Sequence, residues 1–406
     1  MKNLLYTFCL LFILVGCKDD DIDPSVSFTK IYDSFRSDQS YYPIDMVATD
    51  SGFLVLTRQS LSSTTDNKKP AGVQLIELDE EGNYSASSEL NTDEYESPVG
   101  DFVTIDDMHY FVMMDNNKRA QLCKVGNSAS SLEIIALNNG LSWPLAVNVT
   151  ADSLNLILLS FDGVDQMVLS IHDKDGNVIR DDNNNDKIRT FSIGTNIDIS
   201  SAIFDHFSDP ERYGLPFFCG QMDPSTYYFN GIFNHTLSVV FTVFGDAETG
   251  VVQGQSTDGG LTAALPISGS TFSIFGYQYN DNFIQPIQNL ETNSITSSID
   301  FMTVPFSEYR SRTPADIVLY EYNDVQYSVI AAETQSRQIA INVFDATTGE
   351  STGVLKIGNI NPYTLASIKV DEENNLIVLG TTLVSGRFPR MFVKKISEKE
   401  MGSLVK

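Results

Sequence analysis

Short apolar stretches alternate with polar turns along almost the whole chain, and apolar positions with a helical period are nearly absent. In the first clear case, the apolar or β-branched residues 47–49 and 53–57 flank an Asp-Ser-Gly turn. The same strand-turn-strand pattern occurs near the C-terminus, where residues 366–370 and 376–380 flank a Glu-Glu-Asn-Asn turn. Short strands bounded by such turns are typical of antiparallel sheets. The pattern therefore predicts an all-β fold.

The strand-turn-strand pattern recurs at fairly regular intervals along the chain. Successive turns are 56, 46, 57, 72, 43 and 48 residues apart, counted between the acidic residues Asp50, Asp106, Asp152, Asp209, Asp281, Asp324 and Glu372. Most of these spacings are close to the length of a β-propeller blade, in which four strands form one radial sheet. We therefore expect a β-propeller with seven blades, or alternatively eight, since the longest interval has room for two irregular ones. A pair of β-sandwiches is the competing arrangement.

Two local patterns concern the equivalence of the repeats and the closure of the ring. The nearly identical segments Tyr277–Asp281 and Tyr320–Asp324 predict the same hairpin tip in successive repeats, because Asn-Asp tolerates positive φ. Residues Val26–Tyr32 alternate apolar and polar side chains. We expect this N-terminal strand to close the propeller by completing the last blade beside Met391–Ile396. The propeller domain would then span residues 26–406.

The first residues have the features of a secretion signal. A short basic start precedes the apolar run Leu4–Val15, which is too short to span a membrane and typical of a signal peptide. The run ends in Leu-Val-Gly-Cys, which resembles the bacterial lipobox. The resemblance implies a lipoprotein signal peptide at residues 1–16 and a diacylglycerol on Cys17, the first residue of the mature protein. An ordinary secretory signal that contains a cysteine is the alternative.

An acidic cluster follows directly, formed by Lys18, Asp19, Asp20 and Asp21. It resembles the surface-export signal of Bacteroidota lipoproteins. The resemblance implies a lipid-anchored protein of the outer membrane that faces the medium, with residues 17–25 as an acidic tether. The alternative is a solvated tether without a role in export.

Charge and cysteine content narrow the partners and the compartment. The 406 residues carry a formal charge of −27. A nucleic-acid partner is not expected, because phosphate binding needs clustered Lys and Arg. Beyond Cys17 the chain has only Cys123 and Cys219. We expect both to be small buried free thiols, although an oxidising compartment would permit a disulfide.

Candidate chemistry is sparse. The chain has no Gly-x-Ser-x-Gly, P-loop or His-Glu-x-x-His motif, so we assign no catalytic residue and do not favour an enzyme. The four histidines have no metal-ligand spacing. Residues 173–177 and 181–186 form the densest cluster of the oxygen ligands that calcium prefers. Because the EF-hand pattern fails there, we interpret both segments as polar hairpin loops and expect no metal or cofactor, with calcium as the alternative.

Aromatic residues gather at residues 227–233, which read Tyr-Tyr-Phe-Asn-Gly-Ile-Phe. Tyr and Phe in strands usually pack in the core, and this is the interpretation we favour. If exposed, they would suit contact with a partner or a sugar. The single tryptophan, Trp143, stands where one repeat passes to the next. Trp143, Tyr227 and Tyr228 are therefore our candidate ligand or partner contacts.

Taken together, these features resemble the β-propeller surface lipoproteins of Bacteroidota. The resemblance implies a non-enzymatic binding or accessory subunit of an outer-membrane uptake or secretion complex, which would bind that complex or a surface ligand. Two alternatives remain, a propeller polysaccharide hydrolase or lyase and a glycan-binding protein. Acids, or histidine with arginine, converging at the central channel would favour the enzyme, and exposed aromatic platforms would favour glycan binding.

Overall fold

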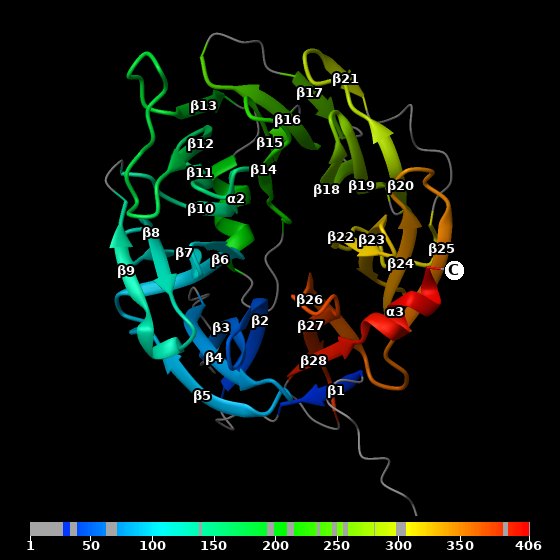
Figure 1. The fold of residues 1–406 in the computed structure, drawn as a ribbon. Helices are drawn as coiled ribbons and strands as arrows, with labels where there is room; N and C mark the ends of the chain where they lie inside the picture. The colour runs from blue at the N-terminus through cyan, green and yellow to red at the C-terminus, as the bar shows by residue number, and fades with distance from the viewer. Residues whose placement is uncertain are drawn as a thin grey trace, which may run out of the picture.

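The computed structural model shows sheets arranged as a ring around a central axis (Figure 1). The structure describes residues 27–32, 39–61, 71–137, 140–192, 199–208, 215–233, 236–245, 250–254, 259–279, 281–297, 306–384 and 389–405. The helical elements among them are short: the 3-10 turn η1 (Ala129–Ser131), α2 (Ile199–Ser208) and α3 (Glu398–Leu404). The prediction of an all-β propeller is confirmed.

Three four-stranded antiparallel sheets come first along the chain, each with its first strand nearest the axis and its fourth at the rim (Figure 1). The first sheet contains β2 (Gln39–Thr49), β3 (Gly52–Leu61), β4 (Gly72–Asp79) and β5 (Tyr84–Glu89). The second contains β6 (Tyr95–Ile105), β7 (Met108–Asp115), β8 (Ala120–Val125) and β9 (Glu133–Ala136). The third contains β10 (Pro144–Val149), β11 (Leu156–Phe161), β12 (Gln166–His172) and β13 (Ile188–Ser192).

The next sheet has eight strands. Its first half contains β14 (Cys219–Gln221), β15 (Thr226–Phe233), β16 (Thr236–Val243) and β17 (Gly250–Gln253). Its second half contains β18 (Gly259–Ser268), β19 (Thr271–Gln278), β20 (Asp281–Asn289) and β21 (Ile295–Ser297). The halves are joined where β16 pairs with β18 at Leu237 and Gly260, and where β21 pairs in parallel with β17.

The blade count expected from the sequence is therefore wrong. The ring has five four-stranded blades and one continuous eight-stranded sheet, not seven or eight separate blades. The physical reason is the path of β21, which leaves β20 and pairs with β17 of the preceding half. This region includes most of the 72-residue interval that made the sequence spacing irregular.

Two four-stranded sheets complete the ring. One contains β22 (Ala315–Tyr322), β23 (Val325–Glu333), β24 (Ile339–Asp345) and β25 (Ser351–Ile357). The other contains β26 (Tyr363–Val370), β27 (Leu376–Thr382), β28 (Arg390–Ile396) and β1 (Phe28–Ile31). In the latter sheet β1 pairs antiparallel with β28, from Phe28 opposite Lys395 to Ile31 opposite Phe392. The two ends of the described chain thus share one sheet.

The two Tyr-x-Tyr-Asn-Asp segments are not equivalent, contrary to the sequence expectation. Residues 320–324 join β22 to β23, the first and second strands of their sheet, and Asn323 and Asp324 have the expected positive φ. The other segment lies between β19 and β20, the second and third strands after β18. In an antiparallel sheet, the connection from the first to the second strand and the connection from the second to the third strand lie at opposite ends. The two similar sequence segments therefore lie at opposite ends of their sheets.

Many hairpins are fixed by an aspartate at the start of the turn. The carboxylate of Asp79 accepts the backbone N–H groups of residues 81 and 83, at 3.0 and 2.7 Å. Asp173, Asp181 and Asp371 each accept the N–H groups two and four residues further on in the same way. Because a short acidic side chain satisfies turn amides that no strand can pair, the recurring Asp-x-x-x-Asn pattern of the sequence is explained as turn chemistry.

The core lies between neighbouring sheets. Leu54 and Leu56 of β3 are fully buried in one cluster with Phe111 and Met113 of β7. A middle strand has a neighbouring sheet on each face, and for this reason every residue of β11 is buried. Such strands read as continuous apolar runs instead of alternating ones.

The helix α2 lies inside the ring beside β10 (Figure 1). Ile203 and Phe207 are buried, whereas Phe204 on the same helix is exposed. Among the helices in the described ranges, none is both long and apolar enough to cross a membrane.

Candidate functional site

The innermost strands bring four charged side chains toward the axis of the ring. They are Asp45 on β2, Asp101 on β6, Asp316 on β22 and Lys369 on β26, here called the central cluster. Asp45 is completely buried, and its Oδ2 lies 3.1 Å from Lys369 Nζ. Asp101 is exposed and interacts electrostatically with the other three.

The carboxylates of the central cluster also bind backbone amides of neighbouring sheets. Asp45 Oδ2 accepts the N–H of Phe102 on β6 at 2.7 Å. Asp316 Oδ2 accepts the N–H of Ile368 on β26 at 2.8 Å, and its Oδ1 accepts the N–H of Ile317 at the same distance. The bonds from Phe102 and Ile368 join an inner strand to the inner strand of the next sheet, so both aspartates hold the ring together.

The protonation of the central cluster follows from burial and mutual charge. Burial raises the pKa of Asp45 to about 6 and that of Asp316 to about 7; Asp101 adds to both shifts and Lys369 opposes them. Burial would lower the pKa of Lys369, but the three carboxylates outweigh it and raise that pKa. Lys369 therefore stays cationic, and the carboxyls of Asp45 and Asp316 take up protons at a higher pH than an ordinary aspartate does.

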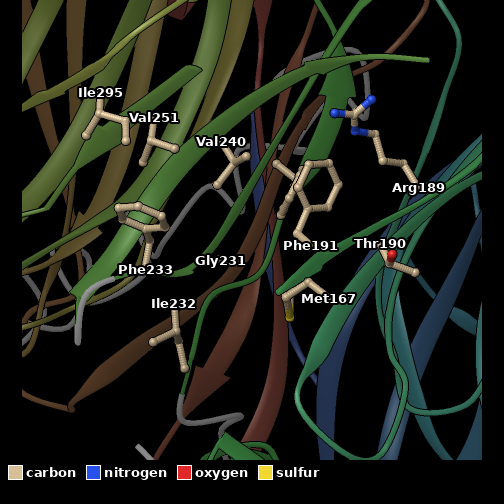
Figure 2. Close-up of a pocket in the computed structure, with 11 residues that line it drawn as sticks. Met167, Arg189, Thr190, Phe191, Gly231, Ile232, Phe233, Val240, Val251 and Ile295 are labelled. Atoms are coloured by element: carbon tan, nitrogen blue, oxygen red, sulfur yellow. The ribbon is translucent and has the colours of Figure 1, made fainter. Parts of the chain in front are cut away.

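A pocket of about 280 Å³ lies between the third sheet and the eight-stranded sheet (Figure 2). We call it the inter-sheet pocket. It is lined by Met167, Arg189, Thr190, Phe191, Phe229, Gly231, Ile232, Phe233, Val240, Val251 and Ile295. The parallel pairing of β17 with β21 places Val251 opposite Ile295 in the register, so the exchange of strands that fuses the two halves also builds one wall of the pocket.

The opposite wall of the inter-sheet pocket is aromatic and carries its one charge. The rings of Phe191 and Phe229 pack at 4.8 Å between centroids. The guanidinium of Arg189 lies over Phe191, 5.7 Å from the ring centroid. Its Nη1 donates to the carbonyl oxygens of Val243 at 3.2 Å and Gly245 at 2.7 Å. These contacts fix the arginine at the edge of the pocket.

Two of the aromatic residues chosen from the sequence are core residues. Tyr227 and Tyr228 are only 3% and 4% exposed. The ring of Tyr227 packs edge-on against Phe244, and that of Tyr228 against Phe272. This burial agrees with the core interpretation favoured from the sequence, and a role of the two tyrosines in partner contact stays a prediction. Their neighbours Phe229, Gly231, Ile232 and Phe233 line the inter-sheet pocket.

Trp143 is half-buried and has a positive φ of 48°. Its ring packs against Phe207 of α2 at 5.8 Å, and the ammonium group of Lys118 lies 5.8 Å from the ring centroid. Trp143 therefore links α2 to the third sheet.

Some of the remaining residues singled out from the sequence lie within the described ranges, and others lie outside them. Cys17, Lys18, Asp19, Asp20 and Asp21 lie outside the described residues, so their roles stay predictions. Cys123 and Cys219 are buried free thiols, as expected. His206 is buried in α2, where burial and Arg58 lower its pKa to about 3.

The oxygen-rich segments at 173–177 and 181–186 form turns in which Asp173 and Asp181 bind their own backbone amides. In the part of the chain that the structure describes, no three His, Cys, Asp or Glu side chains come together as metal ligands. The expectation of no cofactor, with calcium as its alternative, stays a prediction.

Comparisons with known proteins reveal no family. No family model matches the chain, and no curated protein matches it. The chain is similar to the β-propeller domain of the Trilobed protease from Pyrococcus furiosus, which is described as having an open velcro topology. The two are 11% identical, with a TM-score of 0.44. The match covers 87% of this chain and 95% of that one.

Two further solved structures are longer than the part this chain matches. The sialidase of Trypanosoma rangeli, solved with sialic acid, is 9% identical with a TM-score of 0.46, over 92% of this chain and 60% of that one. A prolyl endopeptidase is 9% identical with a TM-score of 0.43, over 85% of this chain. The chain spans about half, 47%, of the length of that endopeptidase. Similarities this low say nothing about activity.

Proposed function

We propose that the protein is a lipid-anchored binding propeller on the outer membrane, facing the medium, and a non-enzymatic binding or accessory subunit of an uptake or secretion complex. The observation that carries this proposal is the inter-sheet pocket, a preformed apolar hollow of about 280 Å³. Binding sites are typically concave, apolar and largely formed before the ligand arrives. The lipid on Cys17 and the export signal Lys18–Asp21 supply the location.

The bonding of the central cluster supports binding over catalysis. A general acid or nucleophile needs an oxygen within hydrogen-bond reach of the substrate. Both oxygens of Asp316 accept backbone N–H groups, and Asp45 has no exposed surface. Two of the three central acids are therefore engaged in holding sheets together.

A propeller hydrolase is the second candidate, because Asp101 is exposed and interacts electrostatically with Asp316, whose pKa is raised to about 7. Glycoside hydrolysis uses such a pair, one carboxylate and one protonated carboxyl. The variant Asp101→Asn separates the two functions, since it removes one negative charge at constant size. It would abolish turnover in a hydrolase and leave a binding protein unchanged.

The anchor is tested by detergent-phase partitioning of membranes. Wild-type protein is expected in the detergent phase and Cys17→Ser in the aqueous phase. Cys9→Ser is the matched control, because that cysteine lies within the signal peptide and should leave lipidation intact. Partitioning of Cys17→Ser with the membrane would contradict the lipobox interpretation.

Surface display is tested by protease shaving of intact cells. Replacing Lys18, Asp19, Asp20 and Asp21 with Ala should preserve lipidation and folding but protect the protein from external protease. Equal cleavage of the variant and the wild type would leave the segment as a tether only.

The binding role is tested on the lipidated full-length protein. Chemical cross-linking of intact cells should join it at constant stoichiometry to an outer-membrane transport or secretion protein, and the purified protein should release no sugar from polysaccharides. Sugar release that Asp101→Asn abolishes would overturn the proposal in favour of the hydrolase.

A further inference from the structure

We propose that the inter-sheet pocket binds one small uncharged ligand with an apolar body of about two fused rings, and that it takes this ligand from the medium. The inference rests on the proposed binding function and adds the chemistry of the ligand and its side of approach. Four observations carry it: the lining, the volume, a glycine in the wall, and the place of the pocket in the ring.

The lining favours ring faces over sugars. Of the eleven lining residues only Arg189 is charged and only Thr190 carries a hydroxyl, and none is acidic. The guanidinium of Arg189 is fixed by the carbonyls of Val243 and Gly245 and rests over Phe191. A bound group would therefore meet aromatic faces, aliphatic groups and the thioether of Met167, which suit an apolar ring better than a polyol.

The volume sets the size of the ligand. An apolar cavity of roughly 150 Å³ accepts one benzene ring, and pockets for drug-sized molecules begin at roughly 300 Å³. The inter-sheet pocket, at about 280 Å³, lies between these limits. One ring would leave part of it empty, and four fused rings would overfill it.

A glycine keeps the hollow open. A Cβ atom on Gly231 would lie 3.2 Å from the ring of Phe229 and 3.8 Å from Cγ of Met167, both of which line the pocket. A longer side chain at this position would therefore occupy ligand space. Because Gly231 has no positive φ, its backbone does not itself require glycine.

The place of the pocket indicates the medium as the source of its ligand. Only nine residues separate Cys17 from Ser27, just before β1, and they reach at most about 35 Å. The edge of the ring at β1 is thus held near the bilayer in the proposed arrangement. The strands that build the pocket, β13, β15, β17 and β21, lie across the ring from β1 (Figure 1). A ligand from the medium therefore has easier access than an acyl chain of the same membrane.

The test is calorimetric titration of the full chain carrying Cys17→Ser, so that no detergent competes for the probe. Phenol, 2-naphthol and 1-hydroxypyrene share one hydroxyl and differ in ring number, and palmitate represents a membrane acyl chain. We expect 2-naphthol to bind about ten-fold more tightly than phenol, because a second ring buries more apolar surface. We expect 1-hydroxypyrene and palmitate to bind no better than phenol.

Two variants tie the binding to the pocket. Gly231→Leu should weaken 2-naphthol binding by about ten-fold or more, because the side chain fills the hollow. Val354→Leu, on a half-exposed position of β25 across the ring, is the matched control and should bind like the parent. Unchanged binding by Gly231→Leu, absence of 2-naphthol binding, or tighter binding of palmitate would each overturn the inference.

The outcomes separate this inference from the proposed function. Cross-linking to an outer-membrane complex without 2-naphthol binding would refute the ligand class and leave the accessory role. Specific 2-naphthol binding by a protein that also hydrolyses polysaccharide through Asp101 would retain the pocket and refute the non-enzymatic function.

Discussion

Between β2, β6, β22 and β26 the centre of the ring is occupied by charged side chains, whereas between β13 and β15 the gap toward the rim is an apolar hollow. In the central cluster Asp45 binds a lysine and a backbone amide, and Asp316 binds two amides. In the inter-sheet pocket, aromatic and aliphatic side chains border about 280 Å³ of unfilled space. Both regions join neighbouring sheets, but they do so with opposite chemistry.

The difference shows which of the two regions can change without loss of the fold. A buried charge costs several kcal/mol unless a partner offsets it, so the central cluster tolerates little alteration. An apolar hollow loses only the dispersion contacts of its lining, and a ligand would restore them. The centre is therefore suited to stability and the hollow to binding.

The largest change in the free energy of unfolding is expected from Lys369→Met, which removes the cation of the central cluster. It would leave the completely buried Asp45 without its cation. Breaking a buried pair costs about 3 to 5 kcal/mol, and because the lysine side chain is 31% exposed we expect about 3 kcal/mol. Denaturant unfolding of the full chain measures the change.

Two further variants serve as controls for this prediction. Lys356→Met removes an ion pair with Glu308 in which both side chains are nearly half exposed, and it should cost less than about 1 kcal/mol. Adding Asp45→Asn to Lys369→Met removes the stranded charge and retains an oxygen for the N–H of Phe102, so much of the loss should be recovered. Equal losses from Lys369→Met and Lys356→Met would contradict the structural role of the central cluster.

Much of the fold could be predicted from the sequence, because turn chemistry is local. The acidic turns between the first and second strands of a sheet, at Asp50, Asp106, Asp152, Asp324 and Glu372, recur with the repeat and reveal the propeller. The number of blades could not be predicted, because it depends on β21 pairing with β17 over a distance of more than forty residues. No local pattern specifies which edge a strand of three residues will join.

The next prediction compares the stability changes caused by substituting two glycines, and it tests whether the inter-sheet pocket has room for a side chain. A Cβ on Gly276 of β19 would lie 2.5 Å from the ring of Phe283 and 2.8 Å from a backbone oxygen, so Gly276→Ala should destabilise by about 2 kcal/mol through overpacking. Gly231→Leu adds a larger group but has the pocket to occupy, so we expect a change below about 1 kcal/mol. Thermal unfolding ranks the two. A greater loss in Gly231→Leu would mean that the pocket is not open space.

The candidate site was less accessible to sequence reasoning than the fold. Tyr227 and Phe229 belong to one strand and one aromatic run, yet the first is core and the second lines the pocket. The distinction depends on which sheet packs against each face of β15, which is a tertiary property. The central cluster was missed for a similar reason, because Asp45 and Lys369 are 324 residues apart in the sequence and meet only when the ring forms.

The last prediction concerns the pH dependence of stability at the central cluster. The pKa of Asp316 is raised to about 7 in the folded protein, above its ordinary value near 3.9 in an unfolded chain. Between these values the folded state binds more protons than the unfolded state, so stability falls as pH rises from about 4 to about 7 and changes little above that. Asp316→Asn cannot ionise and escapes this loss. The stability of Asp316→Asn relative to the wild type should therefore increase between pH 5 and pH 8.

A hairpin aspartate is the matched control for the pH prediction. The backbone N–H groups of Thr348 and Thr347 hold the pKa of Asp345 below its ordinary value. Its stabilising contribution is present above pH 4 and is lost only as pH falls further, so Asp345→Asn should differ from the wild type by a constant amount between pH 5 and pH 8. Denaturant midpoints at several pH values give both differences. A constant difference for Asp316→Asn as well would show that the centre of the ring does not raise the pKa of its carboxyl groups, and that centre and rim differ only in packing.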